Sequence, residues 1–304
     1  MRIGLPHELM HVEWIPNLKS KLIQLVPGSE WVHRPSFKRP VHLFSEGDAC
    51  YPFKEMIRTS LALLPGVDVL LLPRIVGIDG FLMCPNFRAL PDIVALNKER
   101  TGDNNSVPMV TPIMEVSGNE QLELLSRIAA RDLLKISDCH TLREFSDETV
   151  EVDIPCDRDF SRSIALIGHP YVLADPTFNN GIPEMLRKKG FGTILAQEIP
   201  FKELDRLAGS HDYYAKKLYW RCARETLGAF LYFTQVRHPA GIIQLVPFNC
   251  GPDALLRIEL MSLYKGMKDV PPYMVIVCDE HAQRDHVATR VEAFLDIVYG
   301  IKID

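Results

Sequence analysis

The chain has 304 residues, of which 47% are hydrophobic and 24% are charged, and its formal net charge is −5. This length provides ample core for one large or two ordinary domains, and the composition is that of an average soluble globular protein. The acidic balance gives no reason to expect binding to nucleic acid or to an anionic membrane. No apolar run approaches the ~18 residues of a membrane helix, and the N-terminus lacks the apolar core of a secretory signal, so we expect a cytoplasmic protein.

Apolar runs of strand length recur along the chain, and they are near-continuous rather than alternating. They lie at 2–5, 67–73, 107–115, 163–170, 192–199, 241–248 and 273–279. Such runs are typical of parallel strands that are covered on both faces. Helical patterns occupy the intervals, at 53–64, 119–134, 182–190, 253–266 and 286–298. The alternation predicts an α/β fold with mostly parallel sheets.

A polar, acidic stretch at 141–162 separates two halves of this pattern. We therefore predict an N-terminal α/β lobe over 1–145 and a C-terminal α/β lobe over 160–304. A mainly helical segment near 203–235 is expected to form an insertion in the second lobe.

Three of the seven cysteines share a local pattern, because a proline follows each within two residues. Cys50 lies in GDACYPFK, Cys84 in FLMCPNF and Cys250 in PFNCGPD. Proline stiffens the loop that holds the thiol, and an adjacent helix N-terminus favours the thiolate that binds metal. There is no CxxC pair, so the spacing alone also allows three buried structural thiols.

The other four cysteines, Cys139, Cys156, Cys222 and Cys278, lack this proline context. Cys222 falls in a helical stretch and Cys278 ends a buried strand, so both are expected in or near the core. An odd number of cysteines in a long chain favours reduced thiols over a disulfide framework.

Polar groups also follow two of the predicted strands. His169 and Tyr171 come directly after one strand, and Asp279, Glu280 and His281 follow another. Parallel strands deliver such residues to a common edge, where a histidine and a carboxylate can donate protons or hydrogen-bond a cluster sulfur. The alternative is that they cap helices or satisfy loop backbone. Neither GxxxxGK[ST], GxGxxG after the first strand nor GxSxG occurs.

The motifs RIGLPHEL, GDACYPFK, MCPNF, GHPYVLADP, PFNCGPDALL and CDEH, taken in order, resemble a family related to 2-hydroxyacyl-CoA dehydratases. This family is usually labelled acyl-CoA dehydratase activase-related, or CoA-substrate-specific enzyme activase. The resemblance runs over nearly the whole chain. It implies two Rossmann-like lobes and an iron–sulfur cluster, either [4Fe-4S] or of the larger double-cubane type. It also implies a separate ATP-hydrolysing iron–sulfur activase as electron donor.

Carried over residue by residue, the resemblance gives Cys50, Cys84 and Cys250 as cluster ligands. His169, Glu280 and His281 match motif positions and are the catalytic candidates. Two departures stand out: AQRDHVA replaces a small, Gly-rich stretch after CDEH, and the ATPase domain of larger relatives is absent from this sequence.

We therefore expect an iron–sulfur protein of the dehydratase or reductase type. It would carry out low-potential electron transfer, or reductive activation of a small substrate such as a CoA thioester. Its expected partners are the activase and either a homologous subunit or a second copy of the chain. One alternative is a cluster-free α/β binding or scaffold subunit of a larger complex. A third interpretation is a Rossmann-type transferase that uses the edge around His169 and Glu280.

Overall fold

The computed structural model describes residues 1–35, 49–100, 107–136, 159–210 and 218–301. The chain divides into two compact units, Met1–Thr149 and Val150–Asp304, and each unit is described by itself. Cys139, Cys156 and most of the acidic stretch at 141–162 lie outside the described residues.

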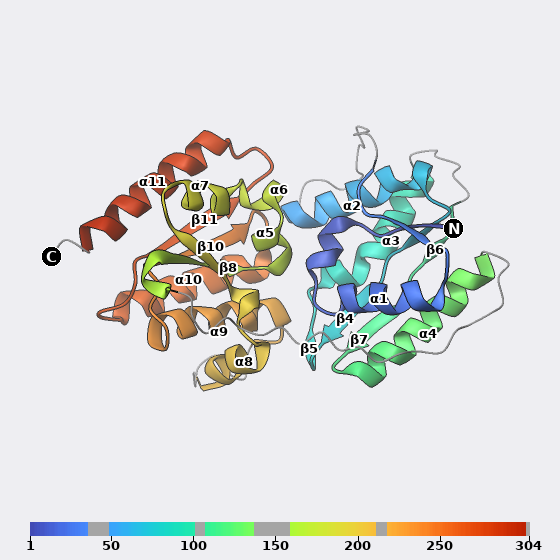
Figure 1. Cartoon of the computed structure of the whole chain (residues 1–304), viewed down its shortest axis with the longest axis horizontal. Helices are drawn as coiled ribbons and strands as arrows, with labels where there is room; N and C mark the ends of the chain where they lie inside the picture. The colour runs from blue at the N-terminus through green and yellow to red at the C-terminus, as the bar shows by residue number, and fades with distance from the viewer. Residues whose placement is uncertain (36–48, 101–106, 137–158, 211–217, 302–304) are drawn as a thin grey trace. The chain divides into compact units, whose positions relative to one another are not determined.

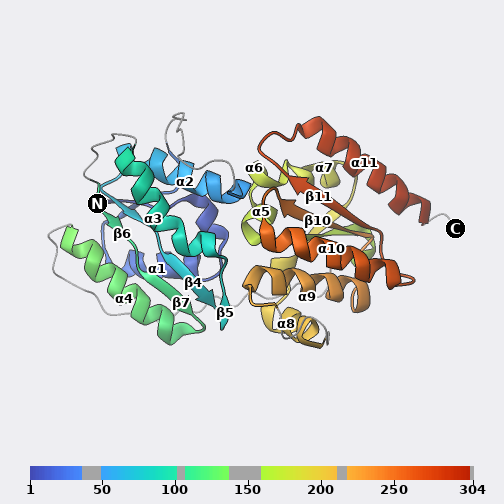
Figure 2. The same cartoon turned by 180° about the vertical axis from the view of Figure 1, so that it is seen from behind.

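The N-terminal unit is built on a parallel sheet in the order β2-β1-β3-β6. Its strands are β1 (Arg2–Gly4), β2 (Glu30–Val32), β3 (Val69–Leu71) and β6 (Met109–Val110). Its helices are α1 (Ile15–Leu25), α2 (Tyr51–Leu63), α3 (Pro85–Arg100) and α4 (Asn119–Ile136). Helices α1 and α4 pack together on one face and α2 and α3 on the other (Figures 1 and 2). This cover on both faces explains why the strands are apolar throughout.

A second, three-stranded sheet continues from the first in the order β5-β4-β7. Its strands are β4 (Arg74–Ile78), β5 (Phe81–Leu82) and β7 (Ile113–Val116). Pro73 separates β3 from β4, and Pro112 separates β6 from β7. The apolar run at 107–115 is therefore two strands rather than one, because proline has no N–H to continue the ladder.

The C-terminal unit repeats the strand arrangement of the first sheet. Its four parallel strands have the order β11-β10-β8-β9, so in each unit the first strand lies between the second and the third. The strands are β8 (Ser163–Gly168), β9 (Gly192–Leu195), β10 (Gly241–Pro247) and β11 (Tyr273–Cys278). The chain reverses its direction of travel across the sheet at the pair β8 and β10, where open α/β folds place their ligands.

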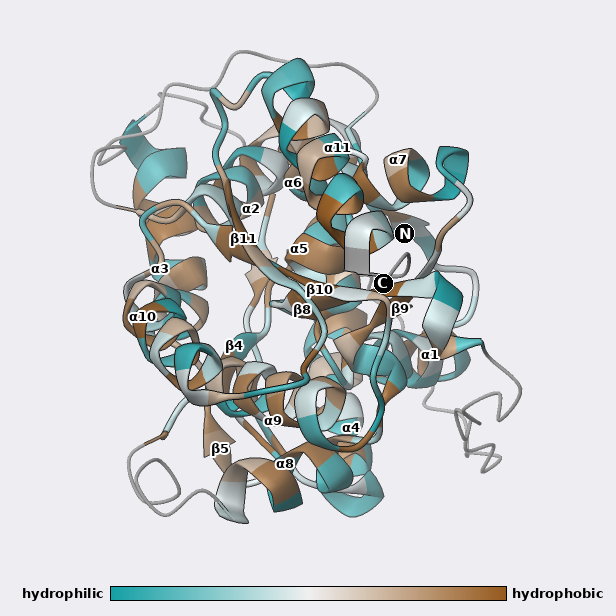
Figure 3. Ribbon diagram, turned by 90° about the vertical axis from the view of Figure 1, so that its left-hand side faces the viewer, coloured by the Kyte–Doolittle hydropathy of each residue, from teal (hydrophilic) through white to brown (hydrophobic). Residues whose placement is uncertain are grey.

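Helices cover both faces of this sheet as well. They are α5 (Pro170–Ala174), α6 (Pro176–Asn179), α7 (Ile182–Lys188), α8 (Phe201–Ser210), α9 (Arg221–Gln235), α10 (Gly251–Gly266) and α11 (Arg284–Ile301). Helices α5, α6, α7 and α11 lie on one side, and α8, α9 and α10 lie on the other (Figures 1 and 2). Figure 3 shows hydrophilic residues on the outer sides of α7 and α11 and hydrophobic residues on the sides that face the sheet.

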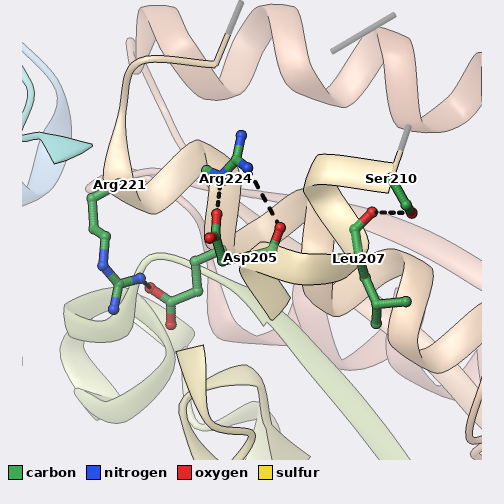
Figure 4. Close-up of polar contacts among 6 residues, drawn as sticks. Asp205, Leu207, Ser210, Arg221 and Arg224 are labelled. Atoms are coloured by element: carbon green, nitrogen blue, oxygen red, sulfur yellow. Dashed lines mark hydrogen bonds and ion pairs between the residues drawn. The ribbon is translucent and has the colours of Figure 1, made fainter. Parts of the chain in front are cut away.

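Helices α8 and α9 approach each other unusually closely. A Cβ placed on Gly228 would come within 2.2 Å of the Leu204 backbone oxygen, so only glycine fits there. Figure 4 shows Arg224 of α9 paired with the Asp205 carboxylate of α8, while the Ser210 hydroxyl donates to the Leu207 carbonyl oxygen at 2.7 Å. Since α9 also packs on β8, the stretch predicted as helical near 203–235 helps to cover the sheet.

Each unit is thus a mostly parallel sheet flanked by helices, which confirms the predicted α/β class of Rossmann-like lobes. Within the part of the chain that the structure describes, every helix is too short or too polar to span a lipid bilayer.

Candidate functional site

In the N-terminal unit, two of the predicted thiols stand at the beginning of neighbouring helices. Cys50 is the N-cap residue of α2, and Cys84 directly precedes Pro85, the first residue of α3. The Asn86 side-chain amide donates a hydrogen bond to the Cys50 sulfur at 3.6 Å, so the first turn of α3 reaches the start of α2. Cys50 is buried and Cys84 is half-buried.

A buried carboxylate fixes the position of α2. Glu8 follows β1 and is 1% exposed, and its Oε1 accepts a hydrogen bond from the Thr59 hydroxyl of α2 at 2.6 Å. Satisfied buried polar contacts of this kind specify one arrangement of the elements that they join. The helix that follows Cys50 is therefore tied to the loop after β1 by a buried hydrogen bond.

In the C-terminal unit, Cys250 is placed by a tight turn after β10. Asn249 adopts a left-handed backbone conformation (φ 61°), which asparagine tolerates, and the Cys250 N–H donates to the Pro247 carbonyl oxygen at 3.1 Å. The turn makes Cys250 the N-cap residue of α10, and Pro252 lies in the first helical turn. The thiol is buried, with the side chain 7% exposed.

His169 reaches the same edge of the sheet from the neighbouring strand. It follows Gly168, where a Cβ would come within 2.5 Å of the Leu245 backbone oxygen of β10, and it caps α5. The His169 Nε2 lies 3.0 Å from the Asp253 Oδ1, and the Nδ1 is hydrogen-bonded to the Tyr171 hydroxyl. Both His169 and Asp253 are buried.

Asp253, which is 0% exposed, is the strongest of the groups that raise the pKa of His169. Burial by itself lowers the pKa of His169, but the charge of Asp253, assisted by Tyr171, Cys222 and Cys250, outweighs it and raises that pKa well above its usual value. An imidazolium facing the carboxylate is therefore the favoured state of the pair in the absence of any other ligand.

The geometry of the pair is not that of a hydrogen bond. The Asp253 and His169 atoms are close enough for an ion pair, yet the Nε2 of His169 and both carboxylate oxygens of Asp253 lack a hydrogen-bond partner. The pair is therefore held together by charge attraction without a hydrogen bond.

Cys278 is the last residue of the adjacent strand, β11. Burial, together with the Asp253 charge, raises the pKa of the Cys278 thiol to about 12, so this cysteine stays protonated. As predicted, it is a core residue and is 1% exposed. Cys222, also predicted near the core, is half-buried and lies close enough to His169 to influence its pKa.

Two predicted catalytic residues lie outside the buried cluster. Glu280 and His281 follow β11, and their Oε1 and Nε2 atoms are 3.9 Å apart. The His281 side chain is 83% exposed, and its backbone N–H donates to the Asp279 carboxylate at 3.3 Å. The structure thus gives His169 a buried setting and His281 a surface one.

Sequence reasoning missed Asp253. It stands three residues after Cys250, inside the first turn of α10, rather than directly beyond a strand. The signal was present in the motif CGPD, because the third residue after an N-cap is again at the helix N-terminus, where a carboxylate is favoured.

A solvent-open pocket of about 860 Å³ lies beside the same unit's α5, α6, α7 and β9. Its polar lining consists of Asn179, Asn180, Glu184, Arg187, Thr193 and Arg284. Pockets of this size hold small molecules. The lining includes Leu173 and Ala174 of α5, the short helix that His169 begins.

Comparison with protein families finds one that spans most of the chain. Residues 2–199 match the family described as the CoA enzyme activase uncharacterised domain (DUF2229). The chain belongs to this family. The matched residues include Cys50, Cys84 and His169, whereas Cys250 and Asp253 lie beyond the match. No curated protein matches the chain.

Proposed function

We propose that the chain is an iron–sulfur protein that supports enzymes acting on CoA substrates. The family membership relates it to the activation of such enzymes. The iron–sulfur part of the proposal rests on one repeated feature: Cys50, Cys84 and Cys250 each stand at the N-terminal end of a helix of at least 13 residues.

The donor set fits a cluster chemically. Iron–sulfur clusters take thiolates, and helix N-termini offer N–H groups that stabilise negative charge. The Asn86 amide that donates to the Cys50 sulfur is the kind of contact that tunes a cluster, and the burial of Cys50 and Cys250 limits the access of water.

When bound, a [4Fe-4S] or double-cubane cluster would supply one-electron transfer at low potential. The residues of the chain would hold it, exclude water and orient a small substrate such as a CoA thioester, for which the pocket beside α5 offers room. His169 is the buried candidate for moving a proton near Cys250. A separate ATP-hydrolysing iron–sulfur activase would deliver the electrons.

The test is the content of iron and acid-labile sulfide in anaerobically prepared protein, with an EPR spectrum after dithionite reduction. We expect about four of each per chain for a single cubane, and more for a double cubane. Cys50→Ala, Cys84→Ala and Cys250→Ala should each lose the cluster signal. Cys278→Ala is the matched control, because it removes a buried thiol that stays protonated.

A full cluster in Cys250→Ala would refute the ligand assignment. Protein that holds neither iron nor sulfide, even after reconstitution, would refute the iron–sulfur proposal. That result would favour the cluster-free binding or scaffold subunit.

A further inference from the structure

One group of three side chains at the carboxyl ends of β8 and β10 is arranged like a set of metal ligands. One donor atom from each of His169, Cys250 and Asp253 lies within 4.8 Å of the other two, and all three residues are buried. His169 follows β8 and Cys250 follows β10, the two strands at which the direction of the chain reverses, and Asp253 lies in the first turn of α10. All three belong to the C-terminal unit.

The first argument for a ligand is the state of Asp253. Its side chain is fully buried, and neither oxygen has a hydrogen-bond partner. A buried carboxylate without hydrogen bonds is costly, and native proteins pair such groups or use them to coordinate metal ions. His169 gives it an opposite charge but no hydrogen bond.

The second argument is the 3.0 Å distance between the His169 Nε2 and the Asp253 Oδ1. Two ligands that each lie about 2.1 Å from one metal ion are themselves roughly 3–3.5 Å apart, with their lone pairs converging on the ion rather than on each other. The His169 Nε2 and the Asp253 Oδ1 lie this close without a hydrogen bond, as two ligands of one ion would.

The third argument concerns the other nitrogen of the His169 ring, Nδ1. The Nδ1 is hydrogen-bonded to the Tyr171 hydroxyl, so a proton on Nδ1 leaves the Nε2 lone pair free for a ligand. Metal-binding histidines almost always have their second ring nitrogen held in this manner.

A nucleophilic Cys–His–Asp arrangement explains the same residues less well. In such a relay the thiol and the carboxylate occupy opposite nitrogens of the imidazole. Here Tyr171 occupies the Nδ1 and Asp253 lies at the Nε2, so no ring nitrogen remains for the thiol of Cys250.

We propose that His169, Cys250 and Asp253 together bind one divalent transition-metal ion of the Zn²⁺ type. Nitrogen, thiolate and carboxylate are all ligands that Zn²⁺ accepts, and three protein ligands leave a fourth position for water or substrate. The ion requires the C-terminal unit alone, whereas the cluster of the proposed function also needs Cys50 and Cys84. Because both use Cys250, the ion and the cluster are alternative occupants of one thiolate.

The experiment titrates cluster-free, full-length protein with Co²⁺ under anaerobic, reducing conditions and records its absorption spectrum. We expect one equivalent to bind with a thiolate-to-cobalt charge-transfer band and with tetrahedral d–d bands. Zn²⁺ should displace the cobalt and raise the melting temperature. The Cys50→Ser/Cys84→Ser double variant should retain all of these signals while losing the iron–sulfur cluster, so the two proposals can fail separately.

Asp253→Asn and His169→Gln should each weaken Co²⁺ binding by more than roughly 100-fold, and Tyr171→Phe should weaken it by roughly 10–100-fold. Circular dichroism shows whether each variant is folded. Because two ligand variants are used, the test stays decisive if one of them does not fold. Unchanged affinity in folded Asp253→Asn, a cobalt spectrum without the thiolate band, or no binding by folded wild-type protein would each overturn the proposal.

Discussion

The contact between α8 and α9 gives a quantitative test of the C-terminal unit. In Gly228→Ala the new methyl group would lie 2.2 Å from the Leu204 oxygen and 2.6 Å from its carbonyl carbon. These are backbone atoms, so no side-chain rotation relieves the overlap, and α8 would have to move away by roughly 1 Å to restore van der Waals contact. The substitution should therefore loosen the pairing of the two helices.

The sign of the stability change in Gly228→Ala depends on two opposing effects. Alanine is preferred to glycine inside a helix by about 1 kcal/mol, whereas overpacking costs typically 1–3 kcal/mol and occasionally more. Because the contact at Gly228 is with backbone, we expect the upper end of that range and a net loss of roughly 2 kcal/mol. For a unit the size of Val150–Asp304 this corresponds to a fall in melting temperature of roughly 4–8 °C.

The assay is thermal and urea unfolding followed by circular dichroism. Gly266→Ala is the matched control, because Gly266 also lies in a helix and a Cβ there meets nothing within 4 Å. Its stability should stay the same or rise by up to about 1 kcal/mol, because alanine is the better helix former. A Gly228→Ala protein as stable as the wild type would show that α8 and α9 do not approach as described.

Four further predictions concern buried residues of the C-terminal unit. The thiol of Cys278, with its pKa raised to about 12, should react far more slowly with a thiol reagent at pH 8–9 than the half-buried Cys84. The thiol of Cys278 ionises near pH 9 in the unfolded chain but stays protonated in the folded protein. The free energy of unfolding should therefore fall above pH 9 by up to about 1.4 kcal/mol per pH unit. This slope should be absent from Cys278→Ala. Gly168→Ala, at a φ of 143° and against a backbone carbonyl of β10, should lower the urea midpoint and weaken Co²⁺ binding together. Arg221→Ala should destabilise the protein by roughly 3 kcal/mol in urea unfolding, since it removes the guanidinium 3.2 Å from the buried Glu225 carboxylate, whereas a loss below about 1 kcal/mol would contradict a buried pair.

Much of the fold could be predicted from apolar runs, because parallel strands covered on both faces leave a strong signal. The run at 241–248 corresponds closely to β10, and the pattern at 119–134 to α4. The small sheet β5-β4-β7 was not predicted. Its shortest strand, Phe81–Leu82, has only two residues, and a proline interrupts the longer run that includes β7, so local pattern carries little information there.

The candidate site was predictable where chemistry coincides with the end of a strand. His169 and Cys250 were found because each comes directly before a helix at the edge of the sheet. Asp253 was not found, since its importance comes from being buried against His169, and burial inside a first helical turn is a tertiary property. The exposure of His281 could not be predicted for the same reason, because exposure also depends on the tertiary structure.

The shared strand order of the two units has a consequence for how the protein is made. All four strands of the first parallel sheet, from β1 to β6, are contained in the first 110 residues, so that sheet can close before the strands of the second unit have left the ribosome. Cys50 and Cys84 belong to this unit, so they can take their places at the starts of α2 and α3 before Cys250 has been synthesised.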